Sequence, residues 1–234
     1  MKRTLVILLT LCLMFTYSTV VFADQTQKAP VCELYSVDGY YEDDLGNQYG
    51  YSYHIPQVNA DTPDAEEINK EIAEEFGSLA EDQFEKMEKE LSLVTGIIEW
   101  DAYWSGDQLF LLVTSDTPGD IIDYAAYGYD FETGSRVTNE MILEQRGISE
   151  EEYMEKLKER VGIMFEDIFK IPEGVETDLN ADEVLEHTLS RLNMDNPMFI
   201  NQYGEIVTIV QIDTIAGAGY NNYLAIAYGT NSDL

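Results

Sequence analysis

The chain has few positively charged residues: 13 Lys and Arg stand against 45 Asp and Glu among 234 residues, and the formal net charge is −32. Binding to nucleic acid depends on Lys and Arg side chains that neutralise phosphates, so this balance argues against a nucleic-acid partner. It also argues against an anionic membrane surface. Two interpretations of the charge remain, a solvated surface that keeps the protein soluble and a field that attracts cationic partners.

Cysteine and histidine are also scarce, with two residues of each. Cys12 lies in an apolar N-terminal segment, so Cys32 is the single cysteine of the rest of the chain and is either a free thiol or the link of a Cys32-linked dimer. His54, His187 and Cys32 are too few and too scattered for a recognisable zinc spacing. A structural role is expected for both histidines.

The sequence contains no H-E-x-x-H motif, no G-x-S-x-G motif and no Walker A loop. With 45 acids, carboxylate pairs arise by chance at any spacing, so no pair indicates acid–base catalysis. Asp178, Asn180 and Asp182 match the first three ligand positions of an EF-hand loop. The match ends there, because Glu183 occupies the glycine position and Leu189 the position of the bidentate Glu. The sequence therefore predicts no catalytic residue, no metal site and no cofactor.

The N-terminus has the features of an export signal. A short basic start precedes an uncharged apolar stretch that ends near Ala23. Val21 and Ala23 occupy the small-residue positions before a signal peptidase site, so residues 1–23 are expected to be removed. The alternative is an uncleaved N-terminal anchor, because about 20 apolar residues can span a bilayer. In both cases the body of the protein is expected to be exported.

After a short polar linker at 24–32, the periodicity of apolar residues predicts an α+β domain. Alternation at 33–41 and 48–55 predicts a β-hairpin. Thr62 followed by Pro63 is typical of a helix start. Apolar residues then recur every three to five positions, which predicts one long helix. This stripe comprises Ile68, Ile72, Phe76, Leu79, Phe84, Met87 and Leu91.

Three strands joined by short turns are expected next, at 98–104, 109–113 and 121–131, as an antiparallel meander. The continuous apolar run LFLLV at 109–113 is typical of a central strand covered on both faces. Helices are expected after Thr138 and Asn180 and at a capping box of Ser149 and Glu152. The final strands are expected at 198–200, 205–212 and 222–228. The prediction is an antiparallel sheet with the long helix and two to three helices of the C-terminal half packed on it.

Aromatic side chains are the candidates for partner binding, because Tyr and Trp are frequent at interface hot spots. Tyr103, Trp104 and Tyr127 are the residues that this reasoning selects. Core packing is the alternative, since alternation places Trp100 and Trp104 on the face under the long helix.

The segment YDFETGSRVT, from Tyr129 to Thr138, combines a strand end, a Gly-centred turn and a helix start. It resembles the "fDl-x-TGk-x-lt" passage of the RsiV/PdaC-like extracellular domain family, shared by a lysozyme-sensing anti-sigma factor and the accessory region of a peptidoglycan deacetylase. The matching residues are Asp130, Phe131, Thr133, Gly134 and Thr138.

Further matches to this family lie upstream and downstream. Tyr53, Ile55 and Pro56 resemble its "Y-x-IP" strand end, and Ile68 with Asn69 resembles its first helix. MFINQYGEIVTIVQIDTIAGAG resembles the closing strand pair, with Gly219 at the final glycine. The chain departs from the family there, because Asp213 replaces an aromatic residue and Gly217 replaces a proline.

The resemblance implies an N-terminal half at 33–129 that is PdaC-like and a C-terminal half at 130–234 similar to the end of RsiV, forming one unit. It also implies a non-catalytic binding or sensing domain, secreted or on the extracellular face of a bacterial cell envelope. The ligand would be a protein or a cell-wall component. Lysozyme or another cationic wall-active protein is the sharpest candidate, since it would suit an acidic domain.

The motif residues look architectural, so no contact residue follows from the resemblance. Two other functions stay open. One is a hydrolase or deacetylase that modifies the cell wall, which a pocket joining His54 or His187 to convergent acids would favour. The other is a structural protein of the envelope.

Overall fold

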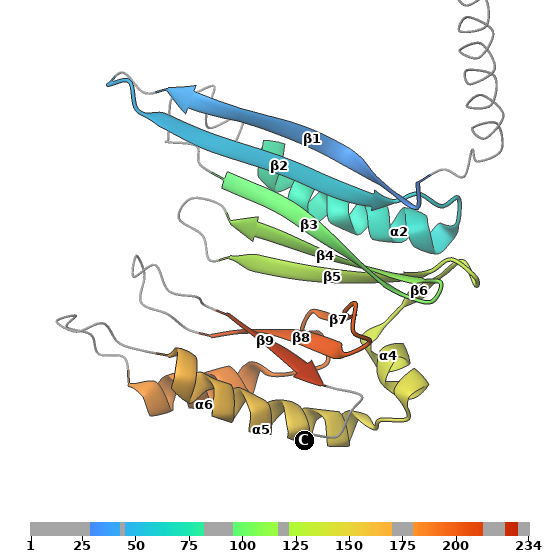
Figure 1. Ribbon diagram of the computed structural model, residues 1–234, viewed down its shortest axis with the longest axis vertical. Helices are drawn as coiled ribbons and strands as arrows, with labels where there is room; N and C mark the ends of the chain where they lie inside the picture. Colours follow the sequence, from blue (N-terminus) through green and yellow to red (C-terminus); the bar gives the residue numbers. More distant parts are fainter. Residues whose placement is uncertain are drawn as a thin grey trace, which may run out of the picture. The chain divides into compact units, whose positions relative to one another are not determined.

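The computed structural model describes residues 29–42, 45–81, 96–116, 122–169, 180–212 and 223–228. Helices and two sheets alternate along these residues, which confirms the predicted α+β class (Figure 1). The N-terminal segment at 1–23 lies outside the described residues.

Six strands form the first sheet in the order β1-β2-β3-β4-β5-β6. They are β1 (Val31–Glu42), β2 (Gln48–Val58), β3 (Gly96–Ser105), β4 (Gln108–Asp116), β5 (Asp123–Asp130) and β6 (Ser135–Val137). The hairpin of β1 and β2 and the meander of β3, β4 and β5 are antiparallel, as predicted. The β2–β3 pair is parallel, so the sheet is mixed, whereas an antiparallel sheet was predicted.

A helical crossover produces the parallel pair. The helix α2 (Pro63–Ile72) connects β2 to β3 and begins at Thr62, whose hydroxyl accepts a hydrogen bond from the N–H of Ala65 at 3.3 Å. Parallel neighbours need such a connection, because a tight turn cannot return the chain to the same end of a strand. Alternating side chains look the same in parallel and antiparallel strands, which is why the strand pattern did not reveal the direction.

The helix changes its winding at η1 (Ala73–Gly77), a π-helical turn, and stays helical to Glu81. Its buried apolar residues recur four apart, at Ile68, Ile72, Phe76 and Ala80. In an α-helix a four-residue step overshoots a full turn by about 40°. The wider turn of η1 offsets this drift and keeps the apolar stripe on the sheet. The predicted stripe residues Phe84, Met87 and Leu91 lie outside the described residues.

Three strands form a second, antiparallel sheet in the order β7-β8-β9. They are β7 (Met198–Ile200), β8 (Ile206–Gln211) and β9 (Tyr223–Tyr228). The helices α4 (Asn139–Arg146), α5 (Glu150–Ile168) and α6 (Ala181–Arg191) begin at Thr138, Ser149 and Asn180, as predicted. The C-terminal strands therefore do not extend the first sheet.

The second sheet packs on the face of the first sheet that is opposite α2. The ring of Phe199 stacks on Tyr103 with centroids 4.7 Å apart, and Tyr223 meets Tyr124 at 4.5 Å. Helices α5 and α6 cover the far side of the second sheet (Figure 1). The order of the layers is thus helix, sheet, sheet and helices.

Asn69 joins α2 to the end of β2, and we predict that it stabilises this junction. Its Oδ1 accepts a hydrogen bond from the N–H of Val58 at 2.7 Å, and its Nδ2 donates to the carbonyl of Val58 at 2.8 Å. Asn69→Ala leaves both backbone groups without these partners and is expected to lower the free energy of unfolding by about 2 kcal/mol in urea. Asn69→Asp keeps the acceptor but places a carboxylate oxygen opposite the carbonyl of Val58, so it is expected to destabilise as well.

Glu66→Ala, on the exposed face of the same helix, is the control, with an expected change within about 0.5 kcal/mol. A loss for Asn69→Ala no larger than that of the control would contradict the prediction.

Candidate functional site

The Gly-centred turn after β5 is held by its own hydrogen bonds. Asp130 Oδ1 accepts from the backbone N–H of Thr133 at 2.9 Å, and Oδ2 accepts from Gln108 Nε2 at 3.1 Å. The bond from Thr133 is the main reason why the pKa of Asp130 lies below its ordinary value. Gly134 has a φ of 72°, a left-handed conformation that a side chain would disfavour. These contacts give the turn an architectural role.

Other motif residues occupy capping and packing positions. Thr138 caps α4, and its hydroxyl accepts a backbone N–H of the first helical turn at 3.4 Å. Tyr53 is buried under α2, and burial raises the pKa of its hydroxyl to about 12. Phe131 meets the ring of Tyr129 edge to face at 4.8 Å. Gly219 lies outside the described residues.

Pro56 pairs with Glu33 where the register of the β1–β2 hairpin shifts. Pro has no N–H to donate to the ladder, and a β-bulge accommodates it. The bulge has a second effect, because side chains alternate along a strand. Glu33 and Asp38 are five residues apart and would face opposite sides of a regular strand. The extra residue between Glu33 and Tyr35 places both carboxylates on the face that carries His54.

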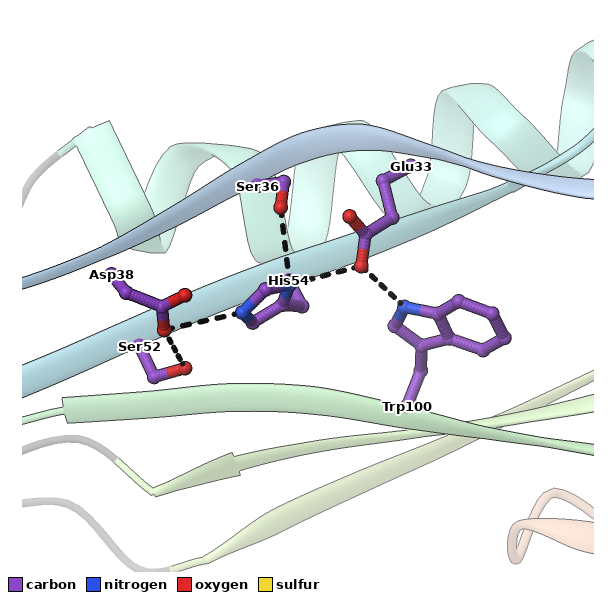
Figure 2. Close-up of polar contacts among 6 residues, drawn as sticks. All are labelled: Glu33, Ser36, Asp38, Ser52, His54 and Trp100. Carbon is purple, nitrogen blue, oxygen red and sulfur yellow. Dashed lines mark hydrogen bonds and ion pairs between the residues drawn. The ribbon is translucent and has the colours of Figure 1, made fainter.

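His54 is the centre of a polar cluster on this face, as Figure 2 shows. Its Nδ1 lies 2.9 Å from Glu33 Oε1, and its Nε2 lies 3.3 Å from Asp38 Oδ1. Ser36 Oγ also approaches Nδ1, at 3.2 Å. The neighbours Tyr53 and Ile55 point the other way into the core under α2, so alternation leaves His54 on the opposite face.

Two further groups complete this His54 cluster, which comprises Glu33, Ser36, Asp38, Ser52, His54 and Trp100. Ser52 Oγ donates to Asp38 Oδ1 at 2.6 Å. Trp100 Nε1, which comes from β3, donates to Glu33 Oε1 at 3.4 Å (Figure 2). The cluster therefore connects the three strands β1, β2 and β3.

The cluster favours its charged form. Hydrogen bonds to Glu33 and then to Asp38 raise the pKa of His54 above the ordinary value. The pKa of Glu33 is lowered, chiefly by its hydrogen bond with Ser36, and that of Asp38 chiefly by its bond with Ser52. Asp38 is 70% exposed, so water screens its attraction for the imidazolium. The geometry suits an ion-paired imidazolium that joins neighbouring strands.

The arrangement differs from a Ser–His–acid site. In such a site one imidazole nitrogen faces the acid and the other faces the hydroxyl nucleophile. Here both nitrogens of His54 face carboxylates, and Ser36 shares Nδ1 with Glu33. His187, the other histidine, is exposed on α6.

A cleft of about 660 Å³ lies at the β5 edge of the first sheet, between η1, β5 and the loop before β7. Four acids line it, and its other lining residues are Tyr124, Ala125, Ala126, Tyr127, Asn139, Asn196, Pro197 and Met198. The acids are Glu71, Glu74, Glu75 and Asp195. Two of these acids belong to η1, and π-helical turns are frequent at functional positions.

The acids of the cleft differ in how far their charge is compensated. Arg136 binds Glu71 with both terminal nitrogens, with Nη1 at 2.7 Å from Oε1, and this lowers the pKa of Glu71. Glu74 lies 3.5 Å from Lys70, but both side chains are exposed, so this pair is weak. Glu75 accepts a hydrogen bond from the hydroxyl of Tyr127 at 2.8 Å. The charged residues that line the cleft are thus all acids.

The three aromatic candidates for partner binding lie in different surroundings. Tyr127 is 6% exposed and lines the cleft, and burial raises the pKa of its hydroxyl. Tyr103 is on the opposite face of the sheet, under Phe199. Trp104 is 43% exposed and stacks on Phe131 at 5.8 Å. The three do not form one surface, and a role of any of them in partner binding stays a prediction.

Cys32 is a partly buried free thiol that accepts a hydrogen bond from Gln57 Nε2 at 3.0 Å. A Cys32-linked dimer stays a prediction. Within the described ranges, no group of three or more His, Cys, Asp and Glu side chains is arranged to hold a metal ion. In the same part of the chain, no helix is long and apolar enough to cross a membrane.

Comparisons with known proteins give little further information. No protein-family model matches the chain, and no curated protein matches it. Its fold is similar to the crystal structure of a DUF3298 family member from Bacteroides fragilis, with 11% sequence identity over 85% of this chain and 90% of that chain and a TM-score of 0.39. This likeness assigns no function.

The pKa of His54 provides a first test of its cluster. In a His187→Gln background His54 is the only histidine, so one imidazole signal can be followed by NMR. We expect it to titrate above about 6.5, the ordinary value for histidine. Glu33→Gln removes the larger of the two carboxylate contributions and is expected to move the pKa back toward that value. Titration at or below the ordinary value, unchanged by Glu33→Gln, would contradict this.

The His54 cluster is expected to stabilise the hairpin over a limited pH range. The raised pKa of His54 gives stability that is present below about pH 6.5 and is lost as pH rises through the raised value. The lowered pKa values of Glu33 and Asp38 give stability that is present above about pH 4 and is lost on acidification. His54→Gln is therefore expected to destabilise more at about pH 5.5 than at about pH 8.5 in urea unfolding. His187→Gln is the control, and a pH-independent effect of His54→Gln would oppose the prediction.

Proposed function

We propose that this protein is an exported, non-catalytic binding domain of a bacterial cell envelope, and that its partner is cationic. The observation that carries this proposal is the cleft beside η1, where Glu74, Glu75 and Asp195 line the same cavity as two tyrosines. A Lys or Arg side chain suits such a cleft. Its charge would meet the carboxylates, and its aliphatic stem would pack on apolar lining residues such as Met198.

The composition of the chain supports the same partner class. A net charge of −32 produces a long-range field that attracts a cationic protein and speeds its association. The export signal predicted at 1–23 would bring the domain to the compartment where wall-active proteins act. Lysozyme or another cationic wall-active protein is the most specific candidate for this partner.

A wall-modifying hydrolase or deacetylase is the alternative from a different class. The His54 cluster brings a histidine and two acids together, which is the feature that would favour it. Since both ring nitrogens face carboxylates, however, neither is placed to take a proton from a substrate or nucleophile. The cluster therefore supports catalysis less than the cleft supports binding.

Binding to lysozyme is the first test of the proposed function. We expect complex formation at low ionic strength and progressive weakening as salt is added, because exposed charges are screened over about 10 Å at 0.1 M salt. Calorimetry at several salt concentrations measures this. Absence of binding at low ionic strength would remove lysozyme as the candidate.

Charge neutralisation tests the cleft itself. The double variant Glu74→Gln, Asp195→Asn removes two charges from the cleft lining and is expected to weaken the complex roughly twofold to thirtyfold, since exposed charge pairs contribute about 0.2–1 kcal/mol each. The matched control is Glu155→Gln, Asp167→Asn on the exposed side of α5. Equal weakening by the two double variants would show that net charge alone, and not the cleft, determines the affinity.

A further inference from the structure

The edge strands of the two sheets differ in how their outer edges are protected. β6 and β7 have three residues each, and β9 has six and packs against α5, where the rings of Tyr228 and Tyr153 are 5.8 Å apart. β1 has twelve residues, and no described strand pairs with its outer edge (Figure 1). An edge of this length presents a row of N–H and C=O groups that can pair with another chain.

The sequence of β1, VCELYSVDGYYE, contains neither Lys nor Pro, the residues that most often block pairing at a sheet edge. A bulge is another protective feature, but here it is confined to the segment between Glu33 and Tyr35. From Tyr35 to Glu42 the register with β2 is regular. Within this part Tyr35 and Tyr40, which are 37% and 66% exposed, add apolar surface. The regular part of β1 is thus able to accept another strand.

We propose that the outer edge of β1, from Tyr35 to Glu42, accepts an extended basic segment of a partner protein as an additional antiparallel or parallel strand. Backbone hydrogen bonds along the edge would supply affinity. The side chains on the two faces of β1 would supply specificity, because an added strand places its residues beside those of β1 in alternation.

The charge of the hairpin selects a basic segment over a second copy of this chain. Residues 31–58 contain five acids and no Lys or Arg. A second copy would bring the same acids of two chains together, each chain with a net charge of −32, and like charges opposite one another destabilise a strand pair. Asp38 is 70% exposed, so a Lys on an incoming strand can reach its carboxylate.

This surface is separate from the acidic cleft, because no residue of β1 lines the cleft. The proposal therefore goes beyond the proposed function and does not depend on it. The cleft variants Glu74→Gln and Asp195→Asn are expected to leave binding at β1 unchanged, so the failure of one site can be told from the failure of the other.

Hydrogen exchange of the full chain with synthetic peptides tests the proposal. The probe is an eight-residue peptide of alternating Lys and Val, compared with an alternating Glu and Val peptide and with a Lys peptide that carries Pro at its two central Val positions. We expect only the first peptide to slow the exchange of backbone amides between Tyr35 and Glu42. Equal protection by the proline-containing peptide, or protection confined to other strands, would overturn the proposal.

A pair of matched tyrosine substitutions locates the site. Tyr40→Lys places a cation on the proposed edge and is expected to weaken the binding of the Lys peptide on the order of fivefold. Tyr203→Lys makes the same change at an exposed tyrosine of the turn between β7 and β8 and is expected to leave it unchanged. Equal effects of the two variants would overturn the assignment. Protection of β1 that rises with protein concentration without peptide would also overturn it, in favour of a second copy.

Discussion

Strand β4 requires cover on both of its faces, and this requirement arranges the other elements. Leu109, Leu111 and Val113 point to one side and pack with α2, whereas Phe110 and Leu112 point to the other side and pack with the second sheet. Each such side chain gains about 1.5–3 kcal/mol when it is fully removed from water. If only α2 covered β4, the side chains on its other face would stay exposed to solvent. The crossover helix and the C-terminal strands therefore pack on opposite faces of the same strand, β4.

This arrangement determines where the polar groups of the hairpin lie. The hydrophobic core between the two sheets includes residues of β3, β4 and β5 but none of the described residues of β1 and β2. One face of the hairpin is consequently left to polar side chains, which Glu33, Asp38 and His54 provide. The bulge opposite Pro56 then decides which acids share that face with His54. A backbone irregularity in an edge strand thus sets the electrostatics of the cluster.

Local features of the fold could be predicted from the sequence, because they depend on neighbouring residues. The caps at Thr62, Thr138 and Ser149 and the hairpin of β1 and β2 are of this kind. The parallel direction of the β2–β3 pair and the separate second sheet were missed, since they depend on how distant segments pack. Apolar and polar side chains alternate in the same way in parallel and antiparallel strands. An apolar strand can also pair in either of the two sheets, so its sequence does not show which sheet it joins.

The candidate sites were missed for a related reason. The odd spacing of Glu33 and Asp38 predicts opposite faces, and only the bulge unites them. Pro56 beside His54 is the one signal that could have suggested an irregular register there. The cleft joins η1 to the loop before β7, more than a hundred residues apart in the chain, and acids are too frequent in this sequence for such a group to stand out.

The parallel β2–β3 pair also has a consequence for the order of folding. Tyr53 and Ile98 are partners although 45 residues separate them, whereas β3, β4 and β5 are joined by short connections. Closing the longer loop costs more chain entropy before any contact repays it. We therefore expect the meander to form in the transition state and the hairpin with α2 to dock afterwards. Substitutions in β4 would then slow folding, while Asn69→Ala would mainly accelerate unfolding, a difference that the two limbs of a chevron plot separate.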